Sequence, residues 1–180
     1  MDFMDTAWDT SLFANSLFVY GTLRDDDVLR IVLGYDLPAH RRRRAVLNDF
    51  NRRMLHDESY PVLAPQPGAC VPGCVLMLDE ADMRRIGFFE ADEYTFEPAQ
   101  VVDELNGQSH DVLLCAEHTT RPGPRYPWSL HDWQREHKPT FVENVHAYMA
   151  LYDTMSAAQA DGVWKKLTGR GQENPASRAG

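Results

Sequence analysis

The chain has 180 residues, of which 43% are hydrophobic and 25% are charged. This length is typical of one domain with a single core, and this composition excludes a wholly disordered chain. The sequence holds no run of about 18 apolar residues of the kind that forms a transmembrane helix. The net charge of −9 disfavours nonspecific binding to nucleic acid or to an anionic membrane surface, so we expect neither as a partner.

The termini and the cysteines set further expectations. Residues 1–10 are acidic, whereas a secretory signal peptide begins with basic residues and continues with an apolar stretch. Cys70, Cys74 and Cys115 form an odd, small set, which favours reduced thiols in a cytoplasmic protein over a disulfide framework. Residues 169–180 are poor in apolar side chains and are expected to form a disordered tail, which leaves a single domain at 1–168.

The first predicted element is a strand at 17–20. Its four residues are apolar in succession, which is typical of a strand that is covered on both faces, and Gly21 ends it. Residues 25–34 then predict a short helix. Aspartates stand at its start, apolar residues follow at helical spacing, and Gly34 ends it.

The composition of segment 39–78 predicts strands and turns. The residues at 60–65 and 74–78 have the composition of two strands. Prolines and glycines separate these two runs, which indicates turns between them.

Residues 79–90 predict a helix that ends in a carboxylate. Asp79 can cap its N-terminus. Met83, Ile86 and Glu90 follow at i, i+3 and i+7, so they share one face. The apolar stripe of this helix therefore continues into the side chain of Glu90.

The following residues predict a hairpin and then a loop. Segments 94–104 and 111–117 read as antiparallel strands joined by the Asn106-Gly107 turn. Residues 119–127 are rich in proline and are expected to form a loop.

The last third of the chain predicts helices. Ser129 and Asp132 form a capping pattern, and apolar residues then recur every three or four positions through 130–152. Pro139 should kink or split this long stripe. A last short helix is expected at 156–167.

The turn after the first strand carries the most specific motif. Residues 18–24, Phe-Val-Tyr-Gly-Thr-Leu-Arg, resemble the signature of the γ-glutamylcyclotransferase-like superfamily. They are closest to the branch of avirulence-induced-gene-2-like proteins and γ-glutamylamine cyclotransferases. Further segments resemble the family in order and spacing, at 60–63, 72–75, 86–94 and 128–148. The resemblance covers 17–152.

This resemblance implies a fold and a reaction. The fold is α/β of the α+β type: a small mixed β-barrel with surrounding helices and a pocket at one barrel mouth. The implied activity is that of a γ-glutamylcyclotransferase, an acyltransferase that acts on a small γ-glutamyl molecule. It releases 5-oxoproline and a free amine or amino acid, and it needs no metal or organic cofactor.

The resemblance also implies roles for particular residues. Glu90 corresponds to the catalytic general acid and base, and we expect it to converge with the turn at the barrel mouth. The residues expected to contact substrate are Tyr20, Gly21, Thr22, Leu23 and Tyr94. A single carboxylate can accept and return the proton if its pKa approaches the working pH, and apolar neighbours are expected to raise the pKa of Glu90.

Three positions depart from the family pattern. Gly87 stands where the family often has Asp, Ala91 where it usually has Gly, and Phe96 where it usually has Arg. These positions affect substrate contacts more than the core reaction. Ala91 and Phe96 keep open the alternative of a noncatalytic domain of the same fold that binds a small carboxylate ligand. Thr22 stands where the glutathione-specific branch typically has Ser, which disfavours glutathione.

Two other patterns have simpler interpretations. Residues 41–44 are four arginines, which a third hypothesis assigns to an acidic protein partner. A strand would point them alternately to opposite faces, so a solvated or ion-paired edge is the simpler interpretation. Cys70 and Cys74 lack the C-x2-C spacing and the additional ligands of a metal or redox site, so we expect no metal.

Overall fold

A computed structural model describes residues 15–55, 60–90, 94–117 and 125–169. The strands within these residues are β1 (Asn15–Val19), β2 (Arg42–Leu55), β3 (Val62–Leu78), β4 (Tyr94–Asp103), β5 (Ser109–Glu117) and β6 (Arg125–Pro127). They pair in the order β3-β1-β5-β4-β2-β6, and β2 also pairs with β3, which closes β1 to β5 into a barrel. β1 and β5 are parallel and the other pairs are antiparallel, so the predicted mixed barrel is confirmed.

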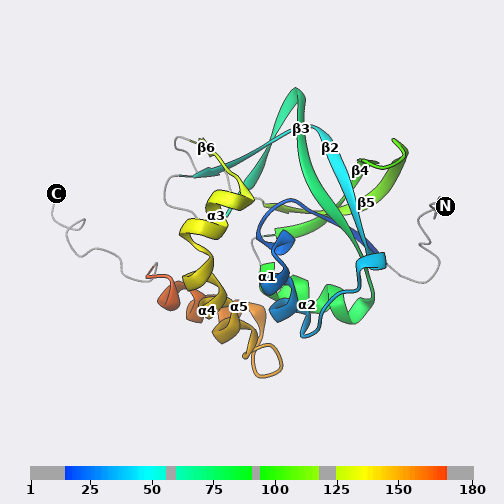
Figure 1. The fold of residues 1–180 in the computed structure, drawn as a ribbon. Coiled ribbons are helices and arrows are strands. Elements are labelled where there is room, and N and C mark those ends of the chain that lie inside the picture. The colour runs from blue at the N-terminus through cyan, green and yellow to red at the C-terminus, as the bar shows by residue number, and fades with distance from the viewer. Residues whose placement is uncertain (1–14, 56–59, 91–93, 118–124, 170–180) are drawn as a thin grey trace, which may run out of the picture.

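The helices gather on one side of this barrel (Figure 1). They are α1 (Asp26–Leu33), α2 (Glu80–Glu90), α3 (Leu130–Glu136), α4 (Lys138–Met149) and α5 (Ala157–Leu167), with short 3-10 helices η2 (Thr22–Arg24) and η3 (Ala39–Arg41). α1 contacts α2 and α4, and α4 contacts α3 and α5. No helix of the described segments is long and apolar enough to cross a membrane.

β1 is apolar on both faces because it separates two hydrophobic clusters. Leu17 and Val19 point to the cluster formed with the helices. Phe18 and Tyr20 point into the cluster inside the barrel. The prediction of a strand covered on both sides is therefore confirmed.

The close pairing of β1 and β3 requires a glycine. Val19 lies opposite Cys74. A Cβ atom added at Gly73 would lie 2.4 Å from the Phe18 ring and 2.6 Å from the Val19 carbonyl oxygen. No side chain fits at this position without a shift of the strand.

We therefore expect Gly73→Ala to lower the free energy of unfolding by about 1–3 kcal/mol, the usual range for overpacking. Urea denaturation measures this. Gly162 of α5 is a matched control, because its added Cβ would have no atom within 4 Å. Gly162→Ala should raise the stability by roughly 0.5–1 kcal/mol through helix propensity. Equal stabilities of the two variants would contradict the close-packing argument.

The prediction of two separate strands in 60–65 and 74–78 is wrong, because both belong to β3. The pairing jumps from Asn48 opposite Cys70 to Phe50 opposite Pro65, so 66–69 bulge out of the ladder. Gly68, with φ of 78°, donates its N–H to Asp49 Oδ1 at 2.8 Å within this bulge. The prolines and glycine thus mark an irregularity and not a strand end.

The predicted loop at 119–127 also needs a correction. Its last residues form β6, in which Pro127 pairs with Arg53 of β2. Residues 119–124 lie outside the described residues, as do 1–10, Ala91 and the expected tail from 170 onward.

Capping residues explain where the helices begin and end. The helix predicted at 25–34 is α1, with Gly34 at φ of 85° after its last turn. Asp79 Oδ1 accepts the N–H of Asp82 at 2.8 Å at the start of α2. Ser156 and Gln159 form a reciprocal capping box on α5. The helices predicted at these three places are confirmed.

Proline splits the long C-terminal stripe as predicted. Ser129 caps α3, which ends at Glu136, and α4 begins at Lys138 with Pro139 in its first turn. Proline is tolerated there because the first N–H groups of a helix have no intrahelical acceptor.

The arginine run is paired with acids on several elements. Arg41 lies in η3 and is buried; its Nη2 lies 2.8 Å from Asp82 Oδ2, and its Nε donates to the Met77 carbonyl at 2.8 Å. Arg42 pairs with Asp26 and Arg44 with Glu104. The ion-paired interpretation is confirmed for these three arginines, and the hypothesis of an acidic protein partner loses its support.

Candidate active site

The turn after β1 is shaped by the segment that follows β2. A Cβ atom added at Gly21 would lie 2.9 Å from Pro61 Cγ. Glycine therefore allows the Tyr60-Pro61 segment to pack directly on the turn. Two of the motifs that resemble the family, 18–24 and 60–63, thus contact one another.

Hydrogen bonds hold Tyr20 and leave donors of the turn available. The Tyr20 hydroxyl donates to the Cys115 carbonyl at 3.1 Å, and the Tyr20 carbonyl accepts from Arg52 Nη1 at 2.8 Å. Inside η2, the N–H of Arg24 donates to the Gly21 carbonyl. Among the described residues, the N–H groups of Thr22 and Leu23 have no hydrogen-bond acceptor. Such adjacent peptide donors can bind an anion.

Asp25 fixes the far end of the turn to the helices. Its carboxylate is 1% exposed and accepts from the N–H groups of Asp27 and Val28. It also accepts from Gln134 Nε2 at 2.8 Å and lies 2.9 Å from Lys138 Nζ. The turn is therefore held between β1 on one side and α3 and α4 on the other.

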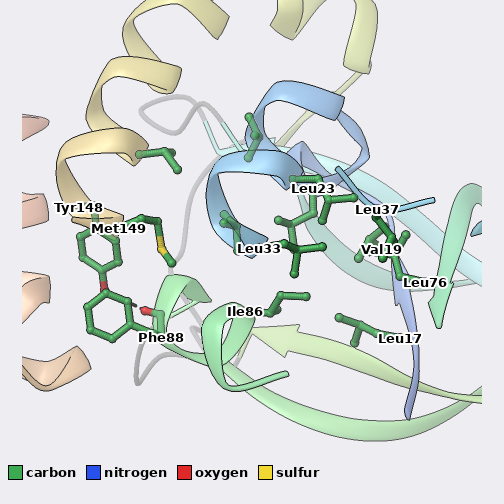
Figure 2. Close-up of a cluster of buried hydrophobic side chains, with 14 of the residues drawn as sticks. Leu17, Val19, Leu23, Leu33, Leu37, Leu76, Ile86, Phe88, Tyr148 and Met149 are labelled. Atoms are coloured by element: carbon green, nitrogen blue, oxygen red, sulfur yellow. Dashed lines mark hydrogen bonds between the residues drawn. The ribbon is translucent and has the colours of Figure 1, made fainter. Parts of the chain in front are cut away.

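Glu90 is the last residue of α2 and is half-buried. The Tyr148 hydroxyl donates to the Phe88 carbonyl at 2.9 Å, and the two rings lie 5.0 Å apart. Ile86 and Phe88 belong to the same hydrophobic cluster as Leu23 of the turn (Figure 2). The core that orients the end of α2 is thus the core into which the turn inserts Leu23.

The strand register brings the turn and Tyr94 to one end of the barrel. Phe18 pairs with Leu114, so two residues further along both strands Tyr20 comes level with Ala116. Ala116 pairs with Thr95 of β4. Only β5 separates β1 from β4, so the backbone at the end of β1 and the backbone at the start of β4 lie about 10 Å apart at the usual strand spacing. Tyr94 is half-buried, and Glu90 precedes it by four residues.

A cavity of about 350 Å³ opens beside this end of the barrel. β2 pairs with β4 at Ala45 and Val46 and then leaves it to follow β3 and β6. The residues that line the space between the diverging strands are mainly apolar, and Glu97 is the charged residue among them. Leu47 and Leu114 of this wall belong to the cluster that contains Tyr20.

The family model described as "Gamma-glutamyl cyclotransferase, AIG2-like" matches residues 17–135. The chain belongs to this family. The match includes the turn, Glu90 and Tyr94, and it confirms the resemblance that the motifs indicated.

AIG2-like relatives from Arabidopsis thaliana are similar over most of the chain. AIG2-like protein A is 28% identical over 141 residues, which cover 77% of this chain and 84% of the relative. AIG2-like protein D is 29% identical over 134 residues, which cover 72% and 85%. A solution structure of an Arabidopsis thaliana protein has 26% identity and a TM-score of 0.54, and the match covers 79% of this chain and 94% of that one.

Gly87 and Phe96, two positions at which the sequence departs from the AIG2-like pattern, lie side by side. A Cβ atom added at Gly87 would lie 3.7 Å from Phe96 Cε2. Phe96 packs against the cluster that contains Ile86. An aromatic ring on β4 thus packs against a side-chain-free position of α2, next to the end of the helix that carries Glu90.

The sequence did not point to Arg52 or to the cavity. Arg52 contacts Tyr20 across 32 positions of the chain, and no neighbouring motif marks it. The cavity lies where β2 diverges from β4, and no local sequence pattern predicts this divergence. Cys70, Cys74 and Cys115 are free thiols, and the described segments contain no group of three His, Cys, Asp or Glu residues placed to hold a metal ion.

Proposed function

We propose that this AIG2-like chain is a γ-glutamylcyclotransferase that releases 5-oxoproline and a free amine or amino acid from a γ-glutamyl compound. Glu90 acts as general acid and base. The turn from Tyr20 to Leu23 binds the anionic groups of the substrate, mainly through its main chain, and Tyr94 borders the pocket.

The reaction needs proton transfer more than a protein nucleophile. The α-amine nitrogen of the substrate attacks its own γ-carbonyl carbon, and the new C–N bond closes the ring of 5-oxoproline. The amide C–N bond to the leaving group breaks. Glu90 takes protons from the attacking nitrogen and returns them to the leaving nitrogen, so the protons balance. Peptide N–H groups of the turn stabilise the negative charge on the carbonyl oxygen or hold the α-carboxylate.

The observation that carries this proposal is the register of β1, β5 and β4. It puts the turn and the start of β4 at one end of the barrel, although more than seventy positions separate them in the chain. The hydrophobic cluster shared by Leu23 and Phe88 supports the same arrangement, because it ties the turn to the helix that ends in Glu90. Family membership agrees with both.

The decisive experiment measures 5-oxoproline release by the purified protein. The panel contains γ-glutamyl amino acids, γ-glutamyl-ε-lysine, other γ-glutamyl amines and glutathione. We expect release from at least one member that depends on Glu90, and the best member names the substrate class. A folded protein that releases nothing from the whole panel would contradict the enzyme assignment.

The noncatalytic alternative is a domain of the same fold that binds a small carboxylate ligand. The contact between Gly87 and Phe96 favours it, since an apolar packing replaces two polar side chains of the family pattern next to α2. Turnover separates the two functions: the alternative predicts binding of a γ-glutamyl compound that is recovered unchanged.

A further inference from the structure

Arg52 is a half-buried cation that contacts the turn and pairs with no acid of the described residues. Its Nη1 donates to the carbonyl oxygens of Tyr20 at 2.8 Å and Pro72 at 3.2 Å. Its Nε is buried and has no hydrogen-bond partner among the described residues. Across residues 15–55, 60–90, 94–117 and 125–169, no carboxylate lies within ion-pair distance of this guanidinium. Arg41, Arg42 and Arg44, by contrast, each pair with an acid.

The strand register puts Arg52 beside the cavity. Arg52 pairs directly with Leu63, and Phe50 precedes it by two positions on β2. Both of these residues line the cavity. Directly opposed residues and residues two apart share one face of a sheet, so the Arg52 side chain leaves the strand on the cavity face. The Trp128 ring covers the guanidinium at 4.9 Å.

A second cation increases the positive potential at this place. Burial, and then repulsion from Arg24, lowers the pKa of Arg52 to about 10, so it stays charged at neutral pH. Burial also lowers the pKa of Arg24. An uncompensated charge in such surroundings is unfavourable in the free protein, and a bound carboxylate would neutralise it with charge-assisted hydrogen bonds.

We propose that Arg52 binds a carboxylate of the γ-glutamyl substrate at the turn. The inference rests on the proposed function for the identity of the substrate. The Arg52 donors that have no partner in the described part of the chain adjoin a turn in which the N–H groups of Thr22 and Leu23 have none there either. Every γ-glutamyl substrate has an α-carboxylate, and a second carboxylate is present when the leaving group is an amino acid.

Kinetics of Arg52→Gln test this binding role. The substrates are γ-glutamyl-alanine, which has both carboxylates, and γ-glutamyl-ethylamide, which has only the α-carboxylate. We expect KM to rise about 10- to 100-fold, the usual loss for a hydrogen bond between charged groups, with little change in kcat. An increase for both substrates assigns Arg52 to the α-carboxylate; an increase for γ-glutamyl-alanine alone assigns it to the leaving group. Unchanged KM values for both overturn the proposal.

Two further variants separate binding from folding. Arg53→Gln removes the same charge at the next position, whose side chain leaves the opposite face of β2, and should keep the wild-type KM. Arg52→Lys keeps the charge but loses the forked donor geometry, so its KM should lie between those of wild type and Arg52→Gln. If Arg52→Gln does not fold, Arg52→Lys carries the test, and a wild-type KM in that variant overturns the proposal.

Calorimetric titration with 5-oxoproline measures binding without turnover, so it distinguishes a failure of the proposed function from a failure of the Arg52 site. 5-Oxoproline retains the α-carboxylate and undergoes no turnover. Suppose that no panel member reacts, that 5-oxoproline binds, and that Arg52→Gln raises the Kd of 5-oxoproline. The proposed function then fails and the carboxylate site stands. If substrates react but Arg52→Gln changes neither KM nor this Kd, the function stands and the carboxylate site is overturned. Absence of both turnover and binding in the wild-type protein overturns both.

Discussion

Glu90→Gln should lower kcat for 5-oxoproline release by about 10²- to 10⁴-fold, the usual contribution of a positioned acid–base group. The amide has nearly the same shape as the carboxylate but cannot accept the proton of the attacking amine. Because binding of the substrate anions is assigned to the turn, KM should change much less. Steady-state kinetics with the best member of the substrate panel measure both quantities.

The matched control is Glu80→Gln at the other end of the same helix. Glu80 is exposed and lies 4.0 Å from Arg84 within α2. This variant has the same change of charge and should retain full activity. Circular dichroism should show that both variants fold. A fully active Glu90→Gln protein would exclude Glu90 as the acid–base group, and equal losses in both variants would point to an effect on the whole helix.

Asp25→Ala should lower the free energy of unfolding by about 2–4 kcal/mol, because it removes a helix cap and half of a buried ion pair. Asp25 accepts hydrogen bonds from the N-terminus of α1, from Gln134 and from Lys138. Lys138 keeps Asp27 at 2.8 Å, which moderates the loss. Urea denaturation measures the change, and Asp26→Ala is the control.

The control residue Asp26 is adjacent, largely exposed and paired with Arg42 on the surface. Exposed ion pairs contribute little to stability, so Asp26→Ala should remain close to wild type. Because Asp25 also fixes the end of the turn, its variant should lose activity at temperatures where the protein is still folded. An Asp25→Ala protein as stable as Asp26→Ala would contradict the assigned role of this network.

The effect of Asp25 should depend on pH in a defined direction. Burial disfavours its charged form, but hydrogen bonds from Lys138 and Gln134 outweigh burial and lower the pKa of Asp25. A lowered folded-state pKa stabilises the protein above the unfolded-state value of about 3.9, and this contribution is lost as pH falls through the folded-state pKa. The stability difference between wild type and Asp25→Ala should therefore shrink below about pH 4.

Local chemistry made most of the elements predictable. Asp25, Asp79 and Ser156 each satisfy N–H groups within three residues, and Gly34 adopts a left-handed conformation directly after α1. Such signals act over one or two turns of chain, so they can be read from the sequence. The bulge at 66–69 misled the prediction because proline and glycine mark irregular backbone without revealing whether the pairing resumes beyond it.

The sequence by itself determined the helices, the two-faced first strand and, through the order of its motifs, the family. Only the tertiary structure decided that Pro61 packs on Gly21, that Arg41 is buried against Asp82, and that Arg52 reaches the Tyr20 carbonyl. Capping and periodicity depend on neighbours in the chain. Which strands pair, in which register, depends on the whole barrel, and that pairing is what brings Arg52 to the turn.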